Sequence, residues 1–329
     1  MSEQNLDAKI VPQKALPVID ISALRSDAAE DRQAVGRALL GACLDKGFFY
    51  IQGHAVPDAL RRSVFRQSKA FFALPEAEKN AINLSHSICN RGYEPLRAQT
   101  LEIGQPPDLK EGFYSGPEIS LDNPRVLAGK FNHGPNQWPA TLPGFRPVME
   151  DYHRVMVALG RLVMGGIALA LDLDDDAFAG FCQDELATLR LLHYPPQPAN
   201  PEPGEKGCGA HTDFGTLTFL AQDDCGGLQV WDEEAGWIHA EPVADTYVVN
   251  LGDMMAAGPT AASARPCTGW SMFRGGNAIR FRFSIWEIRI IRSAASAPVC
   301  PMARRPAIVP PPWKPIIRPC IRRPIPKKP

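Results

Sequence analysis

The feature that most constrains the fold is a run of short strand-like segments in the second half of the chain. Each segment is apolar and bounded by Gly, Asp or Pro turns, and together they cover residues 189–194, 215–221, 227–231, 237–240 and 246–250. Short strands that follow one another at this spacing are typical of a sandwich or barrel. A long helix with an apolar stripe is predicted just before them, over 146–173. Helices first and strands later predict an α+β fold with a β-rich core.

The N-terminal half predicts a mixed region of strands and helices. Apolar runs predict two strands, and apolar residues at helical spacing predict two helices, over 16–21, 47–51, 29–45 and 57–72 in that order. Residues 83–144 are rich in Gly, Pro and Asn, which predicts loops. We therefore separate a disordered lead (1–15) from an N-terminal region (16–145) and from a long helix with a barrel core (146–256).

The composition changes abruptly after Ala256. Residues 257–329 contain 13 prolines, 14 lysines or arginines and one acid, Glu287, which leaves residues 1–256 with a formal charge of about −14. A segment so rich in proline and charge cannot bury enough apolar surface to offset the entropy of ordering the chain. Only 279–291 resembles a strand. We therefore predict that the tail is poorly ordered and that the barrel is incomplete after about residue 256.

The cysteines and the N-terminus indicate the cellular compartment of the protein. The chain has eight cysteines and no C-x-x-C pair, which argues against a zinc site or a disulfide framework. The first residues are polar and lack the apolar segment of a secretory signal, and no apolar run reaches the length of a membrane span. These observations predict a cytoplasmic protein in a reducing environment.

One short motif carries metal chemistry. His211 and Asp213 are two residues apart, and on a strand such residues point to the same face. The imidazole and the carboxylate would then converge on one point. Mononuclear non-haem iron oxygenases bind their metal through two histidines and one carboxylate and leave positions open for cosubstrate and dioxygen. A surface histidine beside an acid is the alternative interpretation, but the pair follows Tyr194-Pro195-Pro196 and a Gly-rich turn and precedes an apolar strand.

Several motifs in one order resemble isopenicillin-N-synthase-like iron(II)/2-oxoglutarate-dependent dioxygenases. They are Pro17–Asp20 (PVID), Gly47–Tyr50 (GFFY), Asn90–Tyr93 (NRGY), Asp108–Phe113 (DLKEGF), Leu191–Pro196 (LLHYPP), His211–Thr218 (HTDFGTLT), Gly226–Val230 (GGLQV) and Val248–Asp253 (VVNLGD). The resemblance covers roughly residues 16–256. The stretch from Gly209 to Leu228 is also similar to the bacterial enzyme that forms ethylene and succinate from 2-oxoglutarate.

The resemblance implies a double-stranded β-helix, or jelly roll, with iron at its mouth. It implies Fe(II) bound by His211 and Asp213, with 2-oxoglutarate as cosubstrate and O2 as oxidant. It also implies that the hydroxyl of Tyr194 contacts the far carboxylate of 2-oxoglutarate, although a ring packed in the core is an equal alternative. Arg190 lies on the same predicted strand, where it either points into the barrel toward an anionic cosubstrate or lies on the surface. His193 and the remaining histidines are predicted to be structural or exposed.

The family pattern fails in the tail. The resemblance calls for a third ligand, a histidine about 55 residues after Asp213 and hence near Thr268, but no histidine follows His239. It also calls for Arg-x-Ser about ten residues further on, where the arginine pairs with the 2-oxoglutarate carboxylate. An Arg-Phe-Ser occurs at 282–284, about four residues late, and we attribute it to coincidence. Cys267 as a substitute ligand is disfavoured, because nothing would hold it in place.

Codon arithmetic leads to the hypothesis that 257–329 are translated in the wrong frame. Cys267-Thr268-Gly269 can be encoded TGC-ACC-GGG, which contains CAC-CGG, the codons for His-Arg. Asn277 to Arg280 can be encoded AAC-GCT-ATT-CGG, which contains CGC-TAT-TCG for Arg-Tyr-Ser, ten codons later in the same shifted frame. Ala256 to Thr260, with one inserted base, gives Ala-Arg-Trp-Thr-Asn, which is also family-like. As written, the chain lacks the third ligand and a bidentate arginine, so we predict an impaired or inactive enzyme.

Three classes of function compete on this sequence. The leading one is an oxidoreductase that hydroxylates or desaturates a small molecule while 2-oxoglutarate becomes succinate and CO2. Ring closure without 2-oxoglutarate, or ethylene formation from it, are alternatives within this class. A catalytically dead paralogue that binds a ligand is the second class. Nucleic-acid binding through the basic tail is disfavoured, because the tail has little aromatic interleaving and no recognition motif. No membrane partner is predicted, and the oligomeric state cannot be inferred.

Overall fold

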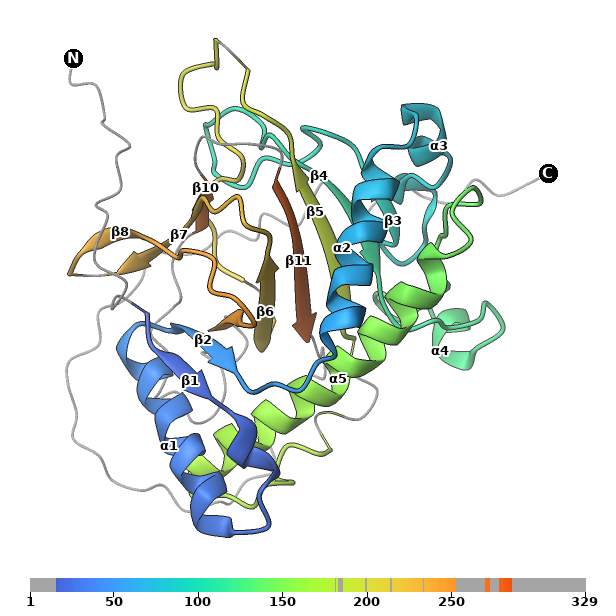
Figure 1. The fold of residues 1–329 in the computed structure, drawn as a ribbon. Coiled ribbons are helices and arrows are strands. Elements are labelled where there is room, and N and C mark those ends of the chain that lie inside the picture. The colour runs from blue at the N-terminus through green and yellow to red at the C-terminus, as the bar shows by residue number, and fades with distance from the viewer. Residues whose placement is uncertain are drawn as a thin grey trace. The chain divides into compact units, whose positions relative to one another are not determined.

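The computed structural model describes residues 16–252, except 181, 183–185, 199, 214 and 233, together with the backbone of two strands at 270–272 and 278–285 (Figure 1). The helices are α1 (Ala29–Asp45), α2 (Asp58–Phe72), α3 (Glu76–Ala81), α4 (Pro124–Leu127) and α5 (Phe145–Ala170), with 3-10 turns η1 (Ser22–Arg25) and η2 (Leu84–His86). The strands are β1 (Val18–Asp20), β2 (Phe48–Gln52), β3 (Gly92–Glu94), β4 (Glu111–Ser115), β5 (Thr188–Tyr194), β6 (Leu217–Gln222), β7 (Leu228–Asp232), β8 (Gly236–His239), β9 (Tyr247–Leu251), β10 (Trp270–Met272) and β11 (Ala278–Ile285).

The strands form two sheets. The larger has eight strands in the order β1-β2-β9-β6-β11-β5-β4-β3, and the smaller has the order β10-β7-β8. All described pairs are antiparallel except β1 with β2. In the middle of the large sheet, from β2 to β5, neighbouring strands are not consecutive in sequence, which is the mark of a jelly-roll-like arrangement rather than a meander. The α+β class with a β-rich core is therefore confirmed.

Helices α2 and α5 lie along one face of the large sheet (Figure 1). The alternation of β5 explains this packing, because successive side chains of a strand point to opposite faces. Leu189 and Leu191 join the main core with residues of α2 and α5, whereas Leu192 and Tyr194 join a separate cluster with Cys208. One face of β5 therefore packs on helices, and the other is available to build a site.

The long helix α5 is a core helix. By length and composition alone it would qualify as a membrane span. Eleven of its residues are buried, among them Met149, Tyr152 and Val163, and it contacts α1, α2 and β11. The hydroxyl of Tyr152 donates to that of Tyr247 on β9 over 3.0 Å, which ties the helix to the sheet. This burial against protein accounts for its apolar stripe.

Most predicted elements are confirmed within a few residues, and two regions differ. The segment predicted as loops, 83–144, contains the short strands β3 and β4, which extend the large sheet beyond β5. The sheets also do not stop at residue 256: β10 joins the small sheet, and β11 lies between β5 and β6. The predicted lead (1–15) and most of the tail lie outside the described residues.

Candidate iron site

His211 and Asp213 lie in an irregular segment that leads into β6, and not on a strand as predicted. The two side chains nevertheless converge, with His211 Nε2 3.6 Å from Asp213 Oδ1. The side chain of Asp213 is fully buried and that of His211 is 15% exposed. The pair is thus accessible on the imidazole side and enclosed on the carboxylate side.

Each of these side chains is oriented by a second contact. Nδ1 of His211 is 2.9 Å from the carbonyl oxygen of Gly209. A carbonyl only accepts, so Nδ1 carries the proton and Nε2 keeps its lone pair toward Asp213. Asn250 on β9 donates from Nδ2 to Asp213 Oδ2 over 3.1 Å, which leaves Oδ1 as the oxygen nearer the imidazole. This arrangement therefore presents Nε2 of His211 and Oδ1 of Asp213 as two donor atoms for a metal.

Residues 102–110 hold the segment that carries His211. Asp108 accepts the backbone N–H of Gly209 over 2.9 Å, and Glu102 accepts that of Ala210 over 3.1 Å. Burial opposes the charge of Glu102, but its hydrogen bonds from Lys206 and Ala210 prevail and lower its pKa. The sequence did not predict this contact. The two segments are about a hundred residues apart, and neither contains a sequence pattern that indicates pairing with the other.

We call the contacts of Glu102 and Asp108 with residues 209–210 the clamp, and two further buried side chains, Lys110 and Cys208, lie against it. Lys110 pairs with the carboxylate of Asp108, and its Nζ is 3.6 Å from the sulfur of Cys208. Burial disfavours the thiolate of Cys208, but Lys110 and His211 outweigh it, so the pKa of this thiol is lowered. The sulfur lies 3.9 Å from Nδ1 of His211. A charged, desolvated network thus surrounds the candidate ligand.

Tyr194 and Arg190 lie on one face of β5, as their spacing predicts. Tyr194 is buried and packs with Leu192 and Cys208. Arg190 is also buried, which excludes the surface interpretation, and its Nη2 donates to Glu94 over 2.7 Å. No pattern in the sequence indicated that an acid would accompany this arginine.

The other histidines have structural partners or lie at the surface. His193 points to the helix side of β5, where its Nδ1 donates to Glu111 over 2.7 Å and its ring stacks on Phe72. It therefore does not face His211. Within the described part of the chain, no group of three or more His, Cys, Asp or Glu side chains is placed to hold a metal. Thr268 and Cys267 lie outside the described residues.

The donor set present fits part of an iron centre. Nitrogen and carboxylate ligands lie about 2.0–2.2 Å from a first-row metal, so two of them on one ion are separated by up to roughly 4 Å. The 3.6 Å between Nε2 of His211 and Oδ1 of Asp213 meets this limit. One imidazole and one carboxylate are two members of the three-residue set of non-haem iron oxygenases. His211 and Asp213 would hold the ion.

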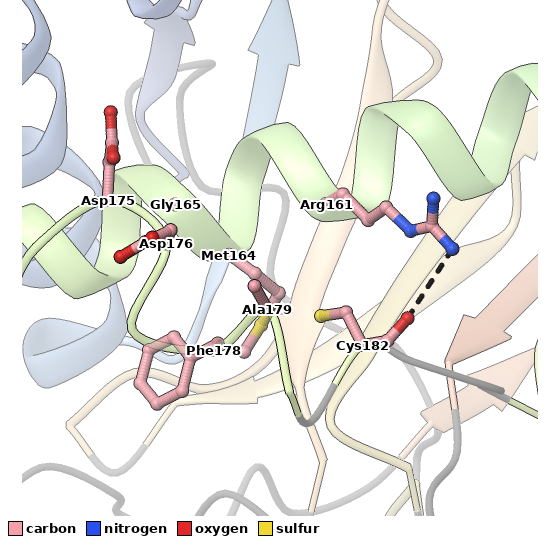
Figure 2. A pocket seen from close by; sticks show the side chains of 8 residues that line it. All are labelled: Arg161, Met164, Gly165, Asp175, Asp176, Phe178, Ala179 and Cys182. Carbon is pink, nitrogen blue, oxygen red and sulfur yellow. Dashed lines mark hydrogen bonds between the residues drawn. The ribbon is translucent and has the colours of Figure 1, made fainter.

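A pocket of about 400 Å³ lies elsewhere, between the C-terminal half of α5 and the residues that follow it. Figure 2 shows the side chains that line it, among them Met164 from α5 and Asp175, Asp176 and Phe178 from the residues after α5. Arg161 donates across it to the carbonyl of Cys182 over 3.4 Å (Figure 2). It shares no residue with the pair His211 and Asp213, so we do not assign it to the chemistry.

Two protein-family models match the chain. Residues 16–141 match the N-terminal domain described as non-haem dioxygenase in morphine synthesis, and residues 186–262 match the 2OG-Fe(II) oxygenase superfamily. The second match contains both candidate ligands. Members of this family use Fe(II) and 2-oxoglutarate, with O2 as the usual co-substrate.

Similar proteins and solved structures agree with these family matches. A 2-oxoglutarate-Fe(II) type oxidoreductase of Emericella nidulans is 43% identical over 246 residues, which are 73% of this chain and 70% of the relative. A 2-oxoglutarate-dependent dioxygenase of Monascus ruber is 43% identical over 251 residues, covering 73% and 75%. A full-length Neurospora crassa protein, solved in complex with alpha-KG and thymine, superposes with a TM-score of 0.71 at 29% identity, over 84% and 87% of the two chains. The chain therefore belongs to the 2OG-Fe(II) oxygenase superfamily.

Proposed function

We propose that this protein is an Fe(II)- and 2-oxoglutarate-dependent oxygenase that hydroxylates or desaturates a small molecule. The observation that carries the proposal is the convergence of His211 Nε2 and Asp213 Oδ1, 3.6 Å apart, in a chain of this superfamily. When bound, the iron and its cosubstrate supply the oxidation of a C–H bond, with succinate and CO2 as coproducts. The protein's own part is to orient the ligands and to bind the substrates.

Tyr194 is our candidate for binding the far carboxylate of 2-oxoglutarate. Its ring is buried beside Cys208, which in turn contacts His211, so it lies on the side of β5 that borders the candidate ligands. A hydroxyl donates well to a carboxylate, and such a charge-assisted bond is stronger than a neutral one. Tyr194→Phe is expected to raise the KM for 2-oxoglutarate about tenfold, while kcat changes less.

A small-molecule substrate is supported by the relatives. The Neurospora crassa protein was solved with thymine. Hydroxylation, desaturation and ethylene formation share one metal and one cosubstrate, so product analysis by mass spectrometry and headspace gas chromatography would separate them. The cytoplasmic location, and the expectation that neither nucleic acid nor a membrane is a partner, stay predictions.

The direct test is Fe(II)-dependent formation of succinate from 2-oxoglutarate. His211→Ala and Asp213→Asn are expected to abolish both iron binding and succinate formation, because each removes one of two described ligands. His133→Ala serves as the matched control, since the ring of His133 hydrogen-bonds the nearby carbonyl of Phe131 in an exposed loop, and its loss is expected to leave both unchanged. Unaltered iron affinity in the His211 variant would refute the assignment.

We also propose that the tail is a shifted frame and that the chain as written turns over poorly. With the codons given above, one base inserted near codon 257 would put a histidine at position 268 and an arginine at position 278. The β5–β11 register pairs position 278 with Tyr194. Directly opposed residues of an antiparallel pair share one face. The restored arginine would then lie beside Tyr194, to which we assign the far carboxylate of 2-oxoglutarate. This proximity follows from the strand register and is independent of the choice of codons.

Resequencing the gene from upstream of codon 256 tests this part. A missing base that restores a histidine at position 268 and an arginine at position 278 would make the protein an ordinary member of the superfamily. A sequence that stands as written would leave two ligands, and a ligand-binding paralogue without turnover would then be the favoured function. Iron-dependent succinate formation by the chain as written would contradict the proposed impairment.

A further inference from the structure

We infer that Arg190, Glu94 and Gln99 form a recognition site for a neutral hydrogen-bond acceptor of the primary substrate, a carbonyl oxygen or a ring nitrogen. The inference rests on the proposed function and deepens it, because it names the chemistry of the molecule that is oxidised. It also assigns Arg190 to the substrate and not to the anionic cosubstrate.

The guanidinium of Arg190 is fixed before any ligand arrives. Its Nη2 donates to Glu94 Oε2 over 2.7 Å and to Gln99 Oε1 over 2.9 Å, which uses both hydrogens of that nitrogen. The ring of Tyr114 lies under the guanidinium, 4.6 Å from its carbon to the ring centroid. Arg190 and Glu94 are 8% and 7% exposed, so solvent screens this pair little. A donor held this rigidly is pre-organised for binding.

One buried donor of this guanidinium remains. Among the residues that the structure describes, none places an acceptor within hydrogen-bond distance of Arg190 Nε. A buried unpaired donor is unfavourable by roughly 1–3 kcal/mol and by more when it is charged. Native proteins therefore keep few of them without a water, an ion or a ligand to pair with. A substrate oxygen or nitrogen that accepts from Nε–H would relieve this penalty on binding.

The donor lies on the site-facing side of β5. Arg190, Leu192 and Tyr194 alternate along the strand and so share a face. Leu192 and Tyr194 pack with Cys208, and Leu101 covers that cluster. Cys208 contacts His211 over 3.9 Å, which connects this face to the candidate iron ligands. The buried donor of Arg190 and the candidate iron ligands therefore lie on the same side of β5.

Glu94 restricts the charge of the ligands that can bind at Arg190. Among the described side chains of the cluster, the positive charge of Arg190 is balanced by the carboxylate of Glu94 at 2.7 Å. A second carboxylate bound at Nε would lie close to Glu94, where like charges repel strongly in a desolvated site. 2-Oxoglutarate, a dianion, is therefore a poor match. A neutral carbonyl group or ring nitrogen accepts the hydrogen bond without that repulsion.

Benzamide and benzoate are matched probes for this charge preference. We would measure their dissociation constants by ligand-detected NMR on the full chain loaded with Zn(II) and 2-oxoglutarate, where no turnover occurs. The wild-type protein is expected to bind benzamide about fivefold more tightly than benzoate. Arg190→Gln is expected to remove that preference and to leave 2-oxoglutarate affinity unchanged. Glu94→Gln is expected to reverse the preference toward benzoate, because the charge of Arg190 is then uncompensated.

Two arginine controls accompany these variants. Arg154→Gln, on the exposed face of α5, is expected to change nothing. Arg282→Gln is included because position 282 pairs with Arg190 in the β5–β11 ladder, and the preference for benzamide is expected to persist. The Glu94 variant keeps the inference testable if the Arg190 variant fails to fold.

The outcomes separate this inference from the proposed function. Weaker 2-oxoglutarate binding in Arg190→Gln, with benzamide binding unchanged, would reassign Arg190 to the cosubstrate and overturn the inference. Absence of benzamide binding to the wild-type protein, or a preference for benzoate, would overturn it as well. Failure of the wild-type protein to bind 2-oxoglutarate with metal would instead count against the proposed function, whatever the two probes do.

Discussion

Asp108 accepts a hydrogen bond from the backbone N–H of Gly209 over 2.9 Å, although 101 positions separate the two residues. The carbonyl of Gly209 in turn lies 2.9 Å from Nδ1 of His211. A side chain at position 209 would not fit, since its Cβ would lie 2.8 Å from that of Glu102. The N-terminal region thus fixes the imidazole of the candidate ligand through two consecutive hydrogen bonds.

The first prediction concerns this clamp. Asp108→Ala is expected to weaken metal binding by roughly 10- to 100-fold, the usual effect of losing a group that orients a ligand. The physical reason is that Gly209 is released, and the imidazole with it. Anaerobic titration with Fe(II), or with Co(II) followed by absorbance, measures the change.

Asp108→Asn distinguishes positioning from charge. Its amide oxygen can still accept from Gly209, but it no longer balances the buried Lys110. We expect the asparagine variant to retain more metal affinity than the alanine variant, while both lose stability. Equal losses of affinity would mean that the charge on Lys110, and not the bond to Gly209, controls the site.

The candidate ligands were predictable from the sequence because their spacing is itself the chemical signal. His211 and Asp213 converge as expected, even though they lie in an irregular segment and not on a strand. Apolar periodicity likewise located α1, whose bounds are Ala29–Asp45 as predicted. Local patterns suffice where the neighbours in space are also neighbours in sequence.

The features that the sequence did not predict depend on contacts between segments that are distant in sequence. Strand β4 is five residues long in a Gly- and Pro-rich region, and it exists because β5 pairs with it. The tail composition argued against ordered structure, yet β11 is inserted between two strands that offer it hydrogen bonds on both edges. The partnership of Arg190 with Glu94 needs two strands to be brought together before it can form.

The second prediction concerns a buried network on the helix side of β5. Glu111 on β4 accepts from Lys79 over 2.7 Å, from Tyr93 over 2.5 Å and from His193 over 2.7 Å. Glu111→Gln leaves the buried ammonium of Lys79 without a counter-charge, so we expect the free energy of unfolding at pH 7 to fall by about 3 kcal/mol. Urea denaturation followed by tryptophan fluorescence measures it.

The same carboxylate gives a pH dependence of definite sign. Burial opposes the charge of Glu111, but hydrogen bonds from His193, Lys79 and Tyr93 outweigh it and hold its pKa below the ordinary value of 4.5. A lowered pKa stabilises the folded state above about pH 4.5, and this contribution is lost as the pH falls through the folded-state pKa. The melting temperature of the wild type should therefore drop more steeply below about pH 4.5 than that of Glu111→Gln. Parallel curves would show that Glu111 does not contribute to acid sensitivity.

The third prediction uses two glycines with opposite surroundings. Gly252 follows β9 and donates its N–H to the carbonyl of Thr216 over 3.0 Å. A Cβ there would lie 1.9 Å from the carbonyl oxygen of Gly215 and 2.8 Å from that of Asp213, so Gly252→Ala must displace the backbone that carries Asp213. We expect a loss of several kcal/mol of stability, by analogy with overpacked cores, together with loss of metal binding. Chemical denaturation and Fe(II) titration measure the two effects.

Gly41→Ala is the matched control for this variant, because nothing lies within 4 Å of its added Cβ in the middle of α1. Alanine is favoured over glycine inside a helix, so this variant is expected to gain up to about 1 kcal/mol with metal affinity unchanged. If Gly252→Ala instead bound metal with the wild-type affinity, the close packing of residue 252 on the Asp213 segment would have no part in the site.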